Sequence, residues 1–377
     1  MNKRLLRLLN VILIAWIAVF VSGCSDRLDM EDSAISLLIG YDLDEDNQIH
    51  FFTMNPAFSK FATKKTQVVE VKTITTRQGR DQLDAQTAGV FHGRKLAVVL
   101  VSKRIVQHED WFRLMDVLFR DGKNAVSSKV VVYDGSLSEI MNLTMTDQPM
   151  LPLLLRGMID TKSARSETVN TTMQELHRQI YEKGGTPSIS EIQLYKGKAI
   201  KLSGIALLDH RGKYVTSLSA KETVLLKILQ NNAKKSFSMT LSIPGESKTG
   251  PFHTDKLSFA SNKIKTKIKT VYREGKFQFD MKIQMHVGLS EHLFPYDVRN
   301  QGKELEHKIA EQVQKQLDQL MKKIQEHQID PIGLGVYARA FEYEQYKKVE
   351  DHWGEALAKA DIHVTVKAAI GSMGAVK

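Results

Sequence analysis

The residue whose chemistry is best defined by its surroundings is Cys24, the single cysteine of the chain. Residues 1–7 carry three basic side chains and no acid, and an apolar run over 8–21 follows, which is typical of a secretory signal. Gly23 directly before Cys24 suits a lipoprotein signal peptidase, which cuts after the thiol has been acylated. We therefore predict a signal peptide over residues 1–23 and lipidation of Cys24; the alternative is an uncleaved anchor helix with an incidental cysteine.

Lipidation of Cys24 would make the mature protein an extracytoplasmic lipoprotein on a short tether, residues 24–33. Two acyl chains, such as palmitate, on a diacylglycerol thioether anchor stably, whereas one anchors only marginally. A lone cysteine excludes an intrachain disulfide and a cysteine-based metal site. The formal net charge of +10 suits a surface beside anionic lipids. Nucleic acid is the wrong partner for an exported protein.

Asp42, Asp44 and Asp46 have the D-x-D-x-D spacing that opens a calcium-binding loop. The match fails further on, because the sixth position is Asn47 where glycine is needed and the twelfth is Thr53 where glutamate is needed. The sequence therefore favours a solvated hairpin tip over a calcium site.

Two basic segments could meet an anion. His92-Gly93-Arg94-Lys95 precedes an apolar strand, and a solvated loop is the favoured interpretation of it. Four lysines alternate with Ile and Thr over 263–270. They could face lipid headgroups, but we favour a gatekeeper role, in which the charges keep an exposed strand from pairing with other chains.

Catalytic motifs are missing from the sequence. The twelve histidines do not cluster, and the chain contains no H-E-x-x-H, G-x-S-x-G or phosphate-binding glycine loop. We predict a non-enzymatic protein without catalytic residues, cofactor or metal. An envelope hydrolase would require an acid and base converging in a pocket.

The elements that must position these residues fall into two halves. Over 34–195, strands that are apolar on both faces alternate with helices, which predicts a mixed sheet covered on both sides, in one or two subdomains. The expected strands are 34–40, 48–54, 67–71, 95–101 and 126–133, and the expected helices 78–90, 109–119, a short one from Ser136, and 165–183.

Residues 196–377 follow a different pattern. Period-two alternation on both sides of the turn 273–276 predicts a long antiparallel hairpin. An apolar stripe over 303–328 predicts a helix that covers the sheet, or alternatively docks a partner. A last helix over 341–359 and a strand over 361–370 complete an antiparallel sheet with packed helices. The fold class is therefore a multi-domain α+β arrangement.

The whole mature sequence resembles the Ger(x)C family, the lipoprotein C subunits of nutrient germinant receptors in spore-forming bacteria. Ser25 stands where the family usually has Trp after the lipidated cysteine. The order and spacing of short segments carry the resemblance: Gly23-Cys24-Ser25-Asp26-Arg27 with Glu31, Ile39-Gly40-Tyr41-Asp42, Phe91 to Leu96, Phe119-Arg120-Asp121 with Val130 to Val132, Ser203 to Leu208 with Leu218 and Glu222-Thr223, and Asp330 to Gly335 with Trp353.

The resemblance implies a non-enzymatic receptor subunit on the outer face of the spore inner membrane, assembled with two integral-membrane subunits, A and B, and needed for germination. Cys24 is the one functional position that it transfers. Direct nutrient binding by this subunit stays open. The alternative is a lipid-anchored solute-binding protein of a transporter, which would have two similar lobes and one cleft between them.

Overall fold

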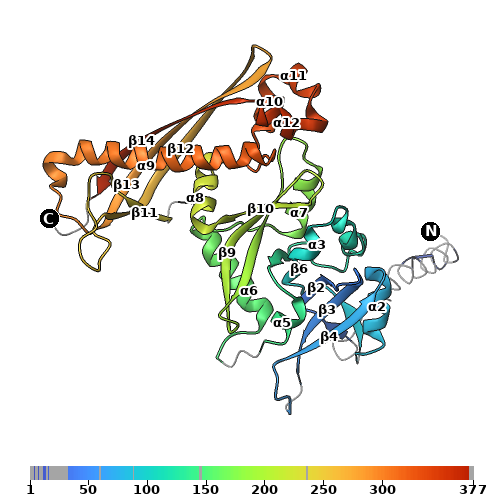
Figure 1. Ribbon diagram of the computed structural model, residues 1–377. Helices are drawn as coiled ribbons and strands as arrows, with labels where there is room; N and C mark the ends of the chain where they lie inside the picture. Colours follow the sequence, from blue (N-terminus) through green and yellow to red (C-terminus); the bar gives the residue numbers. More distant parts are fainter. Residues whose placement is uncertain are drawn as a thin grey trace.

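The computed structural model describes residues 33–372 without 59–60, 88, 144–146 and 235–236, together with residues 4, 7, 12, 13 and 16 (Figure 1). Cys24 lies outside the described residues, and of the predicted tether only Ser33 is described, where it begins β1 (Ser33–Ile35). None of the helices in this described part has the length and hydropathy needed to cross a bilayer.

An eight-stranded mixed sheet forms the larger unit. Its middle strands run parallel, and antiparallel pairs close both sides. The order across the sheet is β10 (Tyr214–Ser219), β9 (Ala199–Leu208), β8 (Ser188–Tyr195), β7 (Lys129–Tyr133), β6 (Val98–Ser102), β2 (Leu38–Leu43), β3 (Ile49–Pro56) and β4 (Thr66–Thr73).

Helices cover both faces of this sheet, as the uninterrupted apolar strands predict. Val99 and Val101 of β6 point to one hydrophobic cluster, and Val98 and Leu100 point to the other. The first cluster is closed by α2 (Thr76–Asp84), α3 (Lys103–Val106), η2 (Trp111–Met115), α4 (Asp116–Arg120) and α7 (Met173–Tyr181), and the second by α5 (Leu137–Met141) and α6 (Leu151–Ala164). A small parallel pair, β1 with β5 (Val90–His92), lies beside them.

The expected helix over 165–183 is wrong in its first half. Residues 165–168 form a turn and a bend and residues 169–172 leave helical geometry, because Thr168 donates to the carbonyl of Gly204 and Thr171 to that of Ser188, which attaches the segment to the sheet. The helix that sequence patterning missed, α6, begins at the Met150-to-Leu155 run. Pro152 sits in its first turn, where a missing N–H costs nothing.

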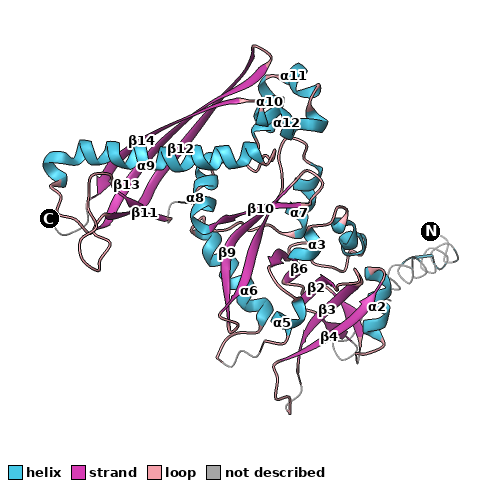
Figure 2. Ribbon diagram, in the orientation of Figure 1, coloured by secondary structure: helices cyan, strands magenta, loops and turns pink. Residues whose placement is uncertain are grey.

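The smaller unit is a four-stranded sheet in the order β11 (Ser238–Ser242), β12 (Lys256–Arg273), β13 (Lys276–His292) and β14 (Asp361–Ser372). The long hairpin is confirmed, with positive φ at Glu274 and Gly275 in its two-residue turn. β14 pairs parallel with β13, so the sheet is mixed. The long helix α9 (Val298–Glu326) covers its apolar face (Figure 2).

The single helix expected over 341–359 is also wrong. Helix α10 (Leu334–Phe341) ends where that span begins, and three short helices follow, α11 (Tyr343–Lys347), η3 (Glu350–His352) and α12 (Trp353–Ala358). Glu342 and Val349 leave helical geometry between them, and the breaks let Tyr346 and Trp353 pack together beside Phe277, with the Tyr346 and Trp353 ring centroids 5.4 Å apart. Tertiary packing has overridden local helix preference here.

The multi-domain α+β class is confirmed. The predicted division at residue 195 falls in the turn between β8 and β9, inside the larger sheet. Whether the chain divides there into independently folding domains stays a prediction.

Candidate functional site at the junction of the two units

Two carboxylates of the acidic hairpin, those of Asp42 and Asp44, make contacts within the protein, whereas Asp46 is exposed at the tip. Asp42 is buried rather than solvated, and it accepts hydrogen bonds from the first backbone N–H of α5 (Leu137, 2.8 Å) and from Arg104 (3.1 Å). Asp44 accepts from His50 (3.0 Å) and Lys72 (3.1 Å). Over the described residues, no group of three or more His, Cys, Asp or Glu side chains is arranged to hold a metal ion.

The His92 segment separates into two environments. His92 is buried, and burial, with nearby Arg94 and Arg80, lowers the pKa of its imidazole. Arg94 and Lys95 are exposed, as a solvated loop requires. The histidine therefore belongs to the interior, and the two basic neighbours belong to the surface.

The lysines at 263, 265, 267 and 269 are exposed on the face of the smaller sheet opposite its apolar core. Among the described residues, β11 pairs with β12 at 256–260, and no described strand lies beside the following part of β12 on that edge. The arrangement is compatible with the gatekeeper role and with an anionic partner, because Lys267 stands directly opposite Lys282 and like charges in that position repel each other.

A densely hydrogen-bonded site lies where the two units meet. The carboxylate of Asp330 is 1% exposed and accepts three hydrogen bonds of 2.8 Å, from the backbone N–H groups of Gly333 and Gly335 and from the indole of Trp353. Burial raises the pKa of Asp330, and the donors from Gly335 and Trp353 oppose that rise. Asp330 thus fixes the turn that leads into α10 and ties it to α12.

The segment before β8 docks onto this turn. The backbone N–H of Thr186 donates to the carbonyl of Asp330 (2.8 Å), and the Asp330 N–H donates to the Thr186 hydroxyl (3.1 Å). The N–H of Val336 donates to the carbonyl of Gly184 (3.1 Å). A Cβ on Gly335 would lie 2.8 Å from the Cα of Gly184, so only glycine allows the two backbones to approach this closely.

Ion pairs surround the contact. Arg339 donates two hydrogen bonds to Glu182, at 2.8 and 3.0 Å, and Lys183 contacts Asp351 at 2.7 Å and Glu350 at 3.2 Å. Each of these pairs includes a partner that is more than a third exposed, so solvent weakens them. Hollows of about 280 and 540 Å3 both touch Glu182, Gly185, Thr186 and Asp330.

A hydrophobic core also runs through the junction. Helix α8 (Ala220–Leu229) starts at a capping box formed by Ser219 and Glu222, and lies between the larger sheet and α9 (Figure 1). One hydrophobic cluster joins Ile205 and Leu207 of β9 to helices α8 and α9 and to the apolar face of both hairpin strands, β12 and β13. Lys323 of α9 donates to the Ser217 carbonyl (2.8 Å). An interface that is this apolar favours a rigid connection over a hinge.

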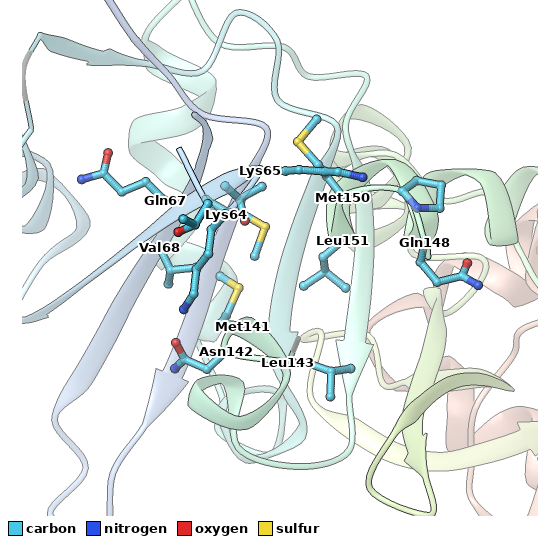
Figure 3. Close-up of a pocket in the computed structure, with 14 residues that line it drawn as sticks. Lys64, Lys65, Gln67, Val68, Met141, Asn142, Leu143, Gln148, Met150 and Leu151 are labelled. Atoms are coloured by element: carbon cyan, nitrogen blue, oxygen red, sulfur yellow. The ribbon is translucent and has the colours of Figure 1, made fainter. Parts of the chain in front are cut away.

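A separate hollow of about 580 Å3 opens beside the outer edge of the larger sheet (Figure 3). We call it the methionine pocket. Lys64 and Lys65 line it together with Met141, Met150 and Leu151 (Figure 3). Its described lining contains these two lysines and no acidic residue; the remaining lining residues are Met54, Thr63, Thr66, Gln67, Val68, Asn142, Leu143, Gln148 and Pro149.

Comparisons with known proteins match both units. The sequence model described as "Spore germination protein N-terminal domain" matches residues 26–194, and the one described as "Spore germination B3/GerAC like, C-terminal" matches residues 203–374. The chain belongs to the GerAC-like spore germination family. The Asp330 turn, Trp353 and the α8 capping box lie in the C-terminal match, and the Gly184 segment lies in the N-terminal one.

Relatives extend over most of the chain. Spore germination protein B3 of Bacillus subtilis (strain 168) is 23% identical over 370 residues, covering 94% of this chain and 95% of that protein. GerQC of Bacillus cereus is 19% identical over 86% of this chain and 88% of its own length. The crystal structure of the GerBC protein shares the fold, with a TM-score of 0.57 and 18% identity over 88% of this chain and 96% of GerBC.

Sequence patterning found some members of the junction and missed how they combine. Asp330, Gly333, Gly335 and Trp353 entered only as pieces of a family resemblance, and Gly184-Gly185 only as the residues that follow the expected helix over 165–183. A possible signal was the pairing of two glycine-containing segments some 150 residues apart, but nothing in a single sequence shows which glycines meet.

Proposed function

We propose that this chain is a lipid-anchored, non-enzymatic subunit of a nutrient germinant receptor, acting on the outer face of the spore inner membrane. It acts by contact with integral-membrane A and B subunits and is required for the germination response. Membership of the GerAC-like family and full-length similarity to spore germination protein B3 support this assignment.

The observation that carries a coupling role is the junction. Family-matched segments from both units meet at Asp330 and share a continuous core through α8. Because close-packed interiors transmit displacement instead of absorbing it, a load applied to one unit reaches the other. A subunit that assembles with membrane partners through one unit can therefore respond through the other.

Lipidation of Cys24 supplies the membrane attachment in this proposal. The support is the basic start, the apolar run and the Gly23-Cys24 pair in the sequence. Two acyl chains on the thiol hold the protein at the bilayer without a spanning helix.

The solute-binding alternative receives no support from the architecture. It requires two similar lobes that close on one cleft, whereas an eight-stranded and a four-stranded sheet stand here. Their apolar connection through α8 also leaves little freedom for hinge closure.

A complementation experiment tests the proposal. The gene is deleted in a strain whose other nutrient receptors have been removed, and germination is followed as loss of spore optical density in single nutrients and mixtures. The wild-type gene should restore the response, and Cys24→Ala should restore much less of it. The Asp330→Ala gene should fail to restore germination. Gly157→Ala, which adds a methyl group in open space on α6, should restore it as the wild-type gene does. A deletion strain that germinates normally would refute the assignment.

A further inference from the structure

The connection between β3 and β4 carries exposed aromatic and basic side chains together. Phe58 is 73% exposed and Phe61 is 93% exposed, and Lys64 and Lys65 follow them on the surface. The Ala57 N–H donates to the Lys65 carbonyl (2.9 Å), which closes the base of this loop. We call these four side chains the aromatic-basic tip. Large apolar side chains in such exposed positions, next to lysines, are a mark of an interaction surface.

The methionine pocket adjoins the tip and has the same dual chemistry. Lys64 and Lys65 belong to both, and Met141, Met150 and Leu151 line the same pocket (Figure 3). Within the described residues, neither lysine amine has a carboxylate within ion-pair distance, and the described pocket lining has no acidic side chain. The expected occupant therefore carries negative charge next to an apolar portion.

The position of the tip in the fold indicates which amphipathic anion it meets. The chain enters the larger sheet at Leu37 and Leu38, and the Leu37 N–H donates to the Met54 carbonyl (3.0 Å), two residues before β3 ends at Pro56. Only β1 and the predicted tether separate this entry point from Cys24. The tip and the point where the chain enters the larger sheet thus lie at the same end of that sheet.

We propose that the aromatic-basic tip docks on an anionic phospholipid bilayer, with lipid headgroups at Lys64 and Lys65 and apolar groups at Phe58, Phe61 and the methionine pocket. Aromatic rings and lysines favour this boundary because each can keep its apolar part in lipid and its charge in water. Docking would add to the anchor on Cys24 and fix the orientation of the subunit over the membrane. This inference deepens the proposed function and rests on the membrane location given there.

Vesicle flotation tests the docking without the lipid anchor. The protein starts at residue 25, and all members of the three hydrophobic clusters lie after that point, so its core is complete. It should float with phosphatidylglycerol-containing vesicles, less well at high salt, and not with phosphatidylcholine alone. Lys64→Gln with Lys65→Gln should lower the partition coefficient about 25-fold. Phe58→Ser and Phe61→Ser should each lower it about tenfold.

The matched control removes the same number of positive charges at a different place on the surface. Lys265→Gln with Lys267→Gln removes two exposed lysines from the smaller sheet, and we expect less than a threefold effect. An equal effect of the control, or no binding to anionic vesicles, would overturn the proposal. Saturable binding of octanoate or glycerol phosphate would also overturn the proposal if it does not displace the protein from the vesicles. The pocket would then be a small-molecule site. Receptor membership is unaffected by these outcomes, because the assay contains neither lipidated Cys24 nor a receptor partner.

Discussion

Replacing Asp330 by alanine removes the central acceptor of the junction. The substitution leaves the N–H of Gly335 and the indole of Trp353 buried without a partner, and the N–H of Gly333 partly so. An unsatisfied buried donor costs about 1–3 kcal/mol, so two of them predict a loss of about 2–6 kcal/mol. Domains are typically stable by only about 5–15 kcal/mol, which makes this a large fraction of the total.

Urea unfolding of the chain from residue 25, followed by tryptophan fluorescence and circular dichroism, measures the loss. Trp353 lies in the site and reports on it directly. Thr186→Val is the matched control, because it removes a single hydrogen bond to the Asp330 N–H and should cost only about 1 kcal/mol. If the free energy of unfolding of Asp330→Ala lies within about 1 kcal/mol of the wild-type value, the carboxylate does not hold the junction together.

Three further substitutions test separate contributions to the stability of the folded chain. Gly335→Ala should destabilise by about 1–3 kcal/mol in urea, because its Cβ meets Gly184, whereas Gly157→Ala should be neutral or stabilising by up to about 1 kcal/mol; equal effects would contradict the close approach. Arg339→Gln should cost less than about 1 kcal/mol, and a larger loss would make the ion pair with Glu182, not Asp330, the main tie. Burial opposes protonation of His50, but Glu70 and Asp44 outweigh it and raise the pKa of the imidazole. The stabilisation of the folded chain by protonated His50 is therefore complete below about pH 6.5, and it is lost as the pH rises through the raised pKa of the imidazole. The urea midpoints of wild type and His50→Gln should differ more at pH 6 than at pH 9, and a constant difference would exclude this linkage.

Periodicity predicted those elements whose own sequence determines them. The hairpin β12–β13 and the helix α9 bury one face each, so alternation of period two and 3.6 identifies them. Residues 165–172 and 341–359 contain helix-forming residues as well, but Thr168, Thr171, Tyr346 and Trp353 make contacts that single-sequence patterning cannot include.

The candidate sites depend even more on distant contacts. Asp42 has calcium-loop spacing, yet the fold uses it to cap α5 and to bind Arg104. The methionine pocket collects side chains from three separate segments, and the junction joins Gly184 to Gly335. Such pairings follow from the topology of the sheets, which no local pattern specifies.

Co-purification from spore inner membranes tests the central claim most directly. The full chain carries a C-terminal affinity tag and is extracted in mild detergent, with Cys24→Ala and Gly157→Ala as parallel samples. We predict that integral-membrane A and B receptor subunits accompany the tagged chain and the Gly157→Ala variant, and that Cys24→Ala recovers far less of them. Recovery of the chain with transporter permeases, or with no integral-membrane partner, would contradict its role as a receptor subunit.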